Sequence, residues 1–434
     1  MYPRKDSWKS GDLPVCPSVQ LGSIAGESLR NRSISSKVNS KEAPQTVLII
    51  GAGPAGLATA ACLRSKYWIP SIILERANCS APLWRYMTYD RLRMHLPKQF
   101  CQLPLRPFPA VYPKYPTKNQ FIAYLEDYQR HFGISPVYNA TVTSAEFSTA
   151  LGLWVVIAEQ KLEDNCETVT YTTRSLVVAT GENAEPYMPD LFGSHKFHGV
   201  ISHGSTYRNG VKYKDMKVLV VGAGNTGMEI SLDLAKFGAK PTLVARSKFH
   251  VMPRDLFGLN ISAFQVMLML LKVLPVSFVD KLLVIFSRLT LGDTDHLNLV
   301  RPKEGPLKMK ARTGHTPVLD VGTVAEVRNG FIKVAPAIDQ LTKSGARFVN
   351  GVEEEFDAVI MATGYTSNVY EWLKIDGMSG INGFPKRPFR NGWKGGRGLY
   401  AVGFGRKGLM GCAHDAELVA DDIGAHHRDN EKTY

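Results

Sequence analysis

The sequence predicts an α/β protein of two domains, each formed around a parallel sheet, with the second domain inserted into a discontinuous first. The apolar run Val47–Ile50 is followed at once by a glycine-rich loop, and the same pattern returns at Val218–Val221. Further apolar runs end in glycine turns at 178–181, 361–364 and 399–403. Because strand, glycine turn and helix in this order form one nucleotide-binding unit, the repetition indicates two Rossmann-like dinucleotide-binding domains.

The first glycine loop carries three glycines with separate tasks. Gly51 permits the tight turn from strand to helix, Gly53 lets the backbone approach a pyrophosphate, and Gly56 lets the helix pack closely on the sheet. A second strand, 72–74, ends at Glu75, whose carboxylate can accept hydrogen bonds from ribose hydroxyls. The sequence therefore predicts an adenosine diphosphate site formed by Gly51, Ala52, Gly53, Pro54, Ala55, Gly56 and Glu75.

The second glycine loop leads to a residue of opposite charge. Its second strand, 242–245, ends at Arg246, 24 positions after the first glycine of the loop, which is also the spacing of Glu75 from Gly51. A carboxylate repels a 2′-phosphate, whereas an arginine can pair with it through two hydrogen bonds. We therefore expect NADPH at the second site; a solvated strand end is the alternative for Arg246, and Lys248 is a possible helper. The site comprises Gly222, Ala223, Gly224, Asn225, Thr226, Gly227 and Arg246.

Two turns, Val178–Gly181 and Met361–Gly364, are expected to carry the chain between the domains. The strand 399–402 and the glycine-rich stretch 403–411 would return to the first domain and close over its ligand. The expected division is a disordered extension at 1–44, the first domain's first part at 45–185, a linker and the second domain at 186–340, and the rest of the first domain with a tail at 341–434.

Composition excludes several classes of function. The net charge is +13, but the basic residues are scattered and form no dense block, so nucleic-acid binding is not expected. The six cysteines include no C-x-x-C pair, which argues against a redox dithiol or a zinc site and favours a reducing compartment. We expect no metal.

The most apolar stretch, 261–291, is interrupted by charged residues and by Pro275. No window reaches the ~18 uncharged residues that a spanning helix needs. The N-terminus also lacks the compact apolar core of a signal peptide. We expect a cytoplasmic protein, with peripheral membrane association left open, and interpret 255–290 as core or lid helices in preference to a membrane contact.

A longer pattern between the two glycine loops carries a family resemblance. Phe197-x-Gly199-x-x-x-His203-x-x-x-Tyr207 matches the signature of flavin-containing monooxygenases. Over roughly residues 45–425 the chain resembles one plant branch, the YUCCA-type indole-3-pyruvate monooxygenases of auxin biosynthesis. The matching blocks include LERANC at 74–79, TYDRLRMHLPKQFCQLP at 88–104, ATGENAEP at 179–186, GNTGMEISLDL at 224–234 and ATGYTSNV at 362–369. The N-terminal extension, Pro82 and the end after Gly411 depart from the pattern.

The resemblance implies a flavoprotein enzyme in which the first domain binds FAD and the second binds NADPH. NADPH would reduce FAD, and oxygen would then add to the flavin to give a C4a-peroxyflavin. Attack on the ketone of indole-3-pyruvate and loss of carbon dioxide would give indole-3-acetate, water and NADP+. The protein would supply orientation, electrostatics and a dry site. The implied partners are therefore an indolic 2-oxo acid and oxygen.

No catalytic residue is fixed by the sequence. His95, Lys98, Asn183 and His203 are candidates near the flavin, the nicotinamide or the substrate. The alternatives are surface loop positions for His95 and Lys98, a capping turn for Asn183, and a hydrogen bond that shapes the linker for His203. The same turn alternative applies to Asn225 and Asn368, and we expect Phe197 and Tyr207 to pack the inter-domain linker.

Three other classes share parts of these motifs. A nitrogen- or sulfur-oxygenating flavin monooxygenase of soft nucleophiles shares all the cofactor motifs, and only the longer plant-type blocks argue against it. A pyridine-nucleotide disulfide reductase needs a cysteine pair, which the sequence lacks. The intact second glycine loop argues against a flavin-binding protein without catalysis.

Overall fold

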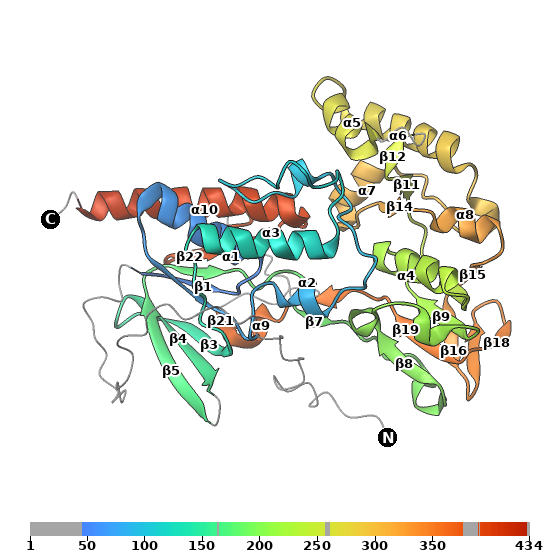
Figure 1. The fold of residues 1–434 in the computed structure, drawn as a ribbon, viewed down its shortest axis with the longest axis horizontal. Coiled ribbons are helices and arrows are strands. Elements are labelled where there is room, and N and C mark those ends of the chain that lie inside the picture. Colours follow the sequence, from blue (N-terminus) through green and yellow to red (C-terminus); the bar gives the residue numbers. More distant parts are fainter. Residues whose placement is uncertain (1–45, 163–164, 257–260, 376–388, 390, 432–434) are drawn as a thin grey trace.

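The computed structural model describes residues 46–162, 165–256, 261–375, 389 and 391–431. The expected extension at 1–44 therefore lies outside the described residues. Figure 1 shows two α/β units side by side, with the long C-terminal helix α10 (Gly408–Glu431) lying along the first.

The first unit is centred on a four-stranded parallel sheet of order β2-β1-β6-β22. The strands are β1 (Val47–Ile50), β2 (Ser71–Leu74), β6 (Leu176–Val178) and β22 (Leu399–Ala401). Because β22 comes from the far end of the chain, the first domain is discontinuous, as predicted. Helices α1 (Pro54–Tyr67), α3 (Lys118–His131) and α10 cover one face, and the antiparallel sheet β21-β3-β4-β5 covers the other (Leu373–Lys374, Ala140–Ser148, Leu153–Lys161, Cys166–Thr173).

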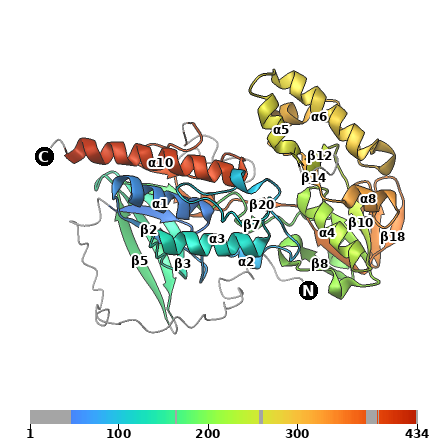
Figure 2. The ribbon, with the colours of Figure 1, turned by 45° about the horizontal axis from the view of Figure 1, so that its top comes forward.

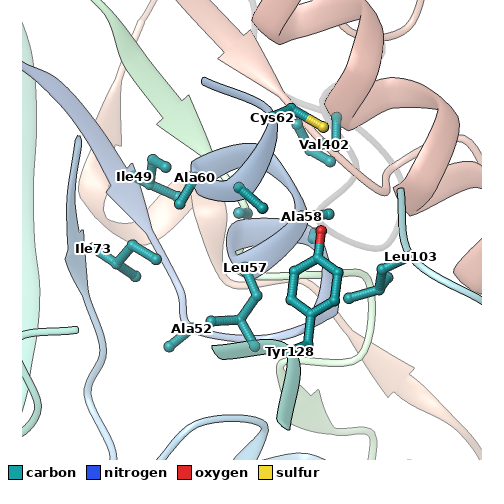
Figure 3. Packing of buried hydrophobic residues seen from close by; sticks show 14 of the residues in the cluster. Ile49, Ala52, Leu57, Ala58, Ala60, Cys62, Ile73, Leu103, Tyr128 and Val402 are labelled. Carbon is teal, nitrogen blue, oxygen red and sulfur yellow. The ribbon is translucent and has the colours of Figure 1, made fainter. Parts of the chain in front are cut away.

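Strand β1 is buried on both faces, which explains its unbroken apolar sequence. Ile49 packs in the cluster beneath α1 and α3, whereas Leu48 and Ile50 pack toward the antiparallel sheet. Figure 3 shows Leu57 of α1 and Tyr128 of α3 in the first cluster. Helix α3 begins with a capping box, in which Thr117 and Gln120 exchange side-chain and backbone hydrogen bonds. The glycine loop thus leaves a rigid, fully packed strand.

The second unit is a five-stranded parallel sheet of order β15-β10-β9-β19-β8. The strands are β8 (Val200–His203), β9 (Lys217–Val221), β10 (Lys240–Val244), β15 (Lys333–Ala335) and β19 (Ala358–Met361), and α4 (Asn225–Lys236) follows β9. We expected this domain to end at 340, but β19 is hydrogen-bonded between β9 and β8, so its sheet extends past that boundary. The strand pairing is non-local, and no nearby residue signals it.

The chain crosses between the units twice, directly after the two predicted turns. β7 (Glu185–Pro186) on the outward path pairs antiparallel with β20 (Tyr365–Thr366) on the return path. The amide of Tyr187 also donates to the carbonyl of Gly364 at 2.9 Å. The two connections therefore form one paired ribbon between the domains.

Both units also contain shorter helices and strands. None of the described helices combines the length and apolarity needed to cross a membrane. Helices α5 and α6 project from the second unit (Figures 1 and 2). The other elements are α2 (Pro82–Tyr86), α5 (Ala263–Leu270), α6 (Val276–Leu291), α7 (Pro306–Thr313), α8 (Thr323–Arg328), α9 (Val369–Trp372), β11 (Val251–Pro253), β12 (Asp255–Leu256), β13 (Ile261–Ser262), β14 (Val318–Asp320), β16 (Ile338–Leu341), β17 (Gly345–Phe348) and β18 (Glu353–Glu355).

Candidate functional site

The first glycine loop has the geometry that its sequence predicts. Gly51 has φ +108°, and a Cβ there would lie 2.6 Å from the carbonyl oxygen of Ala179. A Cβ at Gly56 would lie 2.0 Å from the carbonyl oxygen of Gly51, so this glycine is needed for close packing. A Cβ at Gly53 would meet nothing within 4 Å. The loop therefore opens toward space at Gly53, the position expected to face a pyrophosphate.

Glu75 lies directly after β2, beside this loop. Its Oε2 accepts a hydrogen bond from the amide of Ala52 at 2.8 Å, and its Oε1 accepts one from the amide of Ala77 at 2.9 Å. The side chain is buried; burial raises the pKa of the carboxyl, and the two amide donors oppose that rise. Each carboxylate oxygen has a second lone pair, so Glu75 can still accept hydrogen bonds from ribose hydroxyls.

A cleft of about 330 Å³ joins these parts. Its wall includes Gly53, Glu75, Trp84 of α2, the turn 180–184 and Gly403. The C-terminal glycine-rich stretch thus closes over the first domain's site as expected, and Gly403 is held there because its amide donates to Asp415 Oδ2 at 3.0 Å. An open glycine cradle, a carboxylate at the strand end and an apolar wall fit the adenosine diphosphate part of FAD.

The second loop repeats this arrangement. Gly222 has φ +112°, and a Cβ at Gly227 would lie 1.8 Å from the Gly222 carbonyl oxygen. A Cβ at Gly224 would meet nothing within 4 Å, so this loop also opens at its second glycine. The side chain of Asn225 is directed to the protein, since its Oδ1 accepts from the amide of Leu319 at 2.9 Å. A phosphate can therefore approach the backbone at Gly224, whereas the side-chain oxygen of Asn225 is already bonded within the protein.

Arg246 lies one residue beyond the position in the second unit that is equivalent to Glu75 in the first. Gly51 donates its amide to Leu74, the residue before Glu75, whereas Gly222 donates to Val244, the residue before Ala245. The segment from the first glycine of the loop to the end of the second strand is one residue shorter in the second unit. Ala245 therefore occupies the position equivalent to Glu75, and Arg246 is the next residue. Arg246 is exposed and has no hydrogen bond or ion pair with another described residue. Its donors are therefore available beside the loop.

His95 belongs to a contact between the two domains. Its Nε2 lies 2.8 Å from Oε1 of Glu229, a buried residue of α4. Burial and the neighbouring Glu229 carboxylate raise the pKa of Tyr89, and Arg91 donates to the carbonyl oxygen of Glu229 at 3.4 Å. Sequence reasoning missed Glu229, although two carboxylates among the apolar residues of the MEISLDL segment, Glu229 and Asp233, were a signal. The segment 89–95 of the first domain thus docks on the helix that follows the second glycine loop.

Lys98 has a structural environment. Its Nζ donates to the carbonyl oxygens of Pro109, Ala110 and Tyr112 at 3.0, 2.9 and 2.7 Å. Because an ammonium group has three donors, this lysine is fully used in holding its own loop. The structure does not bring Lys98 to the cleft.

Asn183 and Asn368 both line the first cleft. Asn368 Nδ2 donates to Glu185 Oε1 at 3.1 Å, which ties the return path to the outward path. Asn183 is exposed and stays a candidate for contact with a bound ligand.

His203 ends β8 and shapes the linker. The amide of Ser205 donates to its Nδ1 at 3.1 Å, so the other ring nitrogen, Nε2, donates to the carbonyl oxygen of Gly364 at 3.0 Å. Burial lowers the pKa of His203 and favours this neutral ring. Within the same signature Phe197 is buried, and the Tyr207 hydroxyl donates to Asp233 at 2.7 Å. His203 therefore holds the return path at Gly364, whereas Phe197 and Tyr207 pack in two hydrophobic clusters around the second sheet.

Comparison with solved structures identifies the class to which this fold belongs. A flavin-containing monooxygenase from Stenotrophomonas maltophilia matches with a TM-score of 0.66 at 19% identity, covering 88% of this chain and 98% of that chain. A steroid monooxygenase bound to NADP matches with a TM-score of 0.67 at 19% identity, covering 87% and 84%. Residues 48–256 match the family model described as pyridine nucleotide-disulphide oxidoreductase. The fold is that of the two-domain flavin-dependent oxidoreductases.

Sequence relatives define the family. The chain is 53% identical over 376 residues to the probable indole-3-pyruvate monooxygenase YUCCA4 of Arabidopsis thaliana, covering 87% of this chain and 89% of that protein. It is 49% identical over 387 residues to the indole-3-pyruvate monooxygenase YUCCA1 of Oryza sativa subsp. japonica, covering 89% and 93%. The chain belongs to the YUCCA family of flavin-dependent monooxygenases. It is an oxidoreductase that works with FAD and NADPH, as predicted.

The cysteines bear on the disulfide reductase class considered above. The described cysteines are all free thiols (Cys62, Cys79, Cys101, Cys166 and Cys412), so among them no pair forms a redox disulfide. The match to the disulphide oxidoreductase model therefore reflects the shared dinucleotide-binding plan.

Proposed function

We propose that this enzyme converts indole-3-pyruvate, oxygen and NADPH, with one proton, to indole-3-acetate, carbon dioxide, water and NADP+. The carbon–carbon bond between the ketone and the carboxyl group breaks. One oxygen atom enters the new carboxylate and the other leaves as water. The observation that carries the proposal is identity of about 50% over nearly nine tenths of the chain to indole-3-pyruvate monooxygenases.

FAD would bind in the first domain. The backbone at Gly53 and the first amides of α1, which no side chain caps, would receive the pyrophosphate at the positive end of the helix. Glu75 would accept hydrogen bonds from the ribose hydroxyls. Bound FAD supplies the redox chemistry, since it accepts hydride from NADPH and activates oxygen.

NADPH would bind across the second glycine loop. The backbone at Gly224 and the uncapped start of α4 would receive its pyrophosphate. Arg246 would pair with the 2′-phosphate, which distinguishes NADPH from NADH. Its exposure and its lack of a partner among the described residues support this role.

The contact between the domains would position the two cofactors. Glu229 lies on α4, four residues into the helix that would carry the NADPH pyrophosphate, and it holds His95 of the first domain. Arg208, in the second domain, donates to the carbonyl oxygen of Tyr86 at the end of α2, whose Trp84 lines the first cleft. These contacts would keep the nicotinamide against the flavin and restrict the entry of water.

The test is a product assay with purified, FAD-loaded protein. NADPH and oxygen consumption would be measured with indole-3-pyruvate, other aryl 2-oxo acids, a tertiary amine and a thioether, and products identified by mass spectrometry. We expect indole-3-acetate in near-stoichiometric ratio to NADPH consumed. Turnover of the amine or the thioether, without any acid from the 2-oxo acids, would instead support the nitrogen- or sulfur-oxygenating class.

A cytoplasmic location stays a prediction. It is supported by free buried thiols such as Cys62, whose pKa burial raises to about 12 and which is therefore kept protonated. Fractionation of cells that express a tagged full-length chain would test it.

A further inference from the structure

Helices α5 and α6 form a hairpin at the edge of the second domain. One side of α6 is anchored, because Val279 and Leu283 pack in a small core with Met252. Asp280, also on this side, accepts hydrogen bonds from the amides of Leu307 and Lys308 at 2.7 and 3.2 Å. Figures 1 and 2 show the hairpin extending away from both sheets. Its orientation on the domain is therefore fixed, and no element among the described residues covers its other side.

The uncovered side is strongly apolar. Phe278, Ile285 and Leu289 of α6 are 50%, 54% and 70% exposed. Met269 and Val273, at the tip of the hairpin, are 57% and 78% exposed. The α6 positions 278, 281, 285 and 288–289 recur every three or four residues, so they form one stripe along the helix. Contiguous exposure of this kind marks an interaction surface.

The exposed charged residues of the hairpin, 263–291, are all basic. Lys272, Lys281 and Arg288 are exposed, and none of them makes a hydrogen bond or ion pair with another described residue. The only acidic residue between 263 and 291 is Asp280, which is buried on the anchored side. Apolar and basic side chains thus alternate along one exposed stripe.

We propose that the α5–α6 hairpin docks on an anionic lipid surface, in place of the core or lid role that its sequence favoured. An amphipathic helix with cations beside its apolar face lies in the plane of a membrane, with apolar groups below the headgroups and cations against the phosphates. A second copy of the chain fits this surface less well, because a twofold contact would place the same patch, with basic residues and no exposed acidic ones, on both sides of the interface. The chain's first 45 residues carry seven Lys or Arg and four Asp or Glu, so they also lack charge complementarity to this stripe.

The test is cosedimentation of the FAD-loaded full chain with vesicles of phosphatidylcholine mixed with phosphatidylserine, and with vesicles of phosphatidylcholine alone. One variant combines Lys281→Gln with Arg288→Gln, and another combines Phe278→Ser, Ile285→Ser and Leu289→Ser. The matched control combines Lys343→Gln with Val111→Ser and Phe331→Ser, which are exposed positions outside the hairpin. Circular dichroism and FAD content check that each variant is folded.

We expect the wild type to bind the anionic vesicles, and added salt to weaken that binding. Each neutralised cation lowers the partition coefficient by about fivefold. The triple serine variant lowers it by at least about tenfold, and the control leaves it unchanged. Absence of wild-type binding, equal binding to the uncharged vesicles, or equal binding by the hairpin variants would overturn the proposal. Concentration-dependent self-association that the hairpin variants abolish would instead assign the surface to a second copy.

Discussion

Replacement of Glu75 by glutamine tests the role of the first strand end. The carboxylate accepts from two buried amides, those of Ala52 and Ala77, at 2.8 and 2.9 Å. Glutamine can accept only one of them, and its NH2 group meets the other donor. The unsatisfied amide costs about 1–3 kcal/mol, which relief of the buried charge partly offsets. The lost charged acceptor for the ribose costs about 1.5–3 kcal/mol, so the dissociation constant of FAD rises by ~10- to 150-fold.

The assay is titration of apoprotein with FAD, followed by flavin fluorescence, for the wild type, Glu75→Gln and the surface control Glu159→Gln. The control should bind as the wild type does. Unchanged FAD affinity in Glu75→Gln, with the protein folded, would refute the assignment of this carboxylate to the ribose.

Three further predictions concern the domain contact, the glycines and pH. A double-mutant cycle with His95→Ala and Glu229→Gln, measured by thermal unfolding, should give a coupling energy of about 0.5–3 kcal/mol. If the two substitutions change the free energy of unfolding additively, the two side chains do not interact. Gly56→Ala should lower the melting temperature because its Cβ meets a carbonyl oxygen at 2.0 Å, whereas Gly53→Ala should fold normally and lose FAD; the opposite pattern would contradict the loop assignment. Because burial lowers the pKa of His203 below its ordinary 6.5, the unfolded chain binds the extra proton first, so the free energy of unfolding should fall as pH drops below 6.5. Denaturant titrations across pH should show a shallower slope in His203→Gln.

The sequence predicts local features of this fold well. The first and third glycines of both loops make the tight turn and the close helix packing expected of such loops, because these features depend on neighbouring residues. Approach of a pyrophosphate at the second glycine stays a prediction. Glu75 also lies beside its loop as expected. The inter-domain crossings follow the two Ala-Thr-Gly turns, because these turns end the buried strands β6 and β19.

Features that depend on distant partners were harder to predict. β19 joins the second sheet between strands from elsewhere in the chain, which the run 356–361 does not signal by itself. His95 and Glu229 are 134 positions apart, so their contact follows only from the docking of two domains. Lys98 resembles a ligand-binding lysine in sequence, yet its loop folds back and uses all three donors. The offset of Arg246 arises from a connection that is one residue shorter.

The most direct measurement of the two-cofactor account is the ratio of kcat/KM for NADPH to that for NADH, in the wild type, Arg246→Ala and the surface control Lys343→Ala, an exposed lysine outside both glycine-loop sites. Loss of a charge-assisted pair worth about 1.5–3 kcal/mol should lower kcat/KM for NADPH by ~10- to 150-fold in Arg246→Ala. The value for NADH should change little, because that cofactor has no 2′-phosphate. An unchanged ratio in Arg246→Ala would contradict the account.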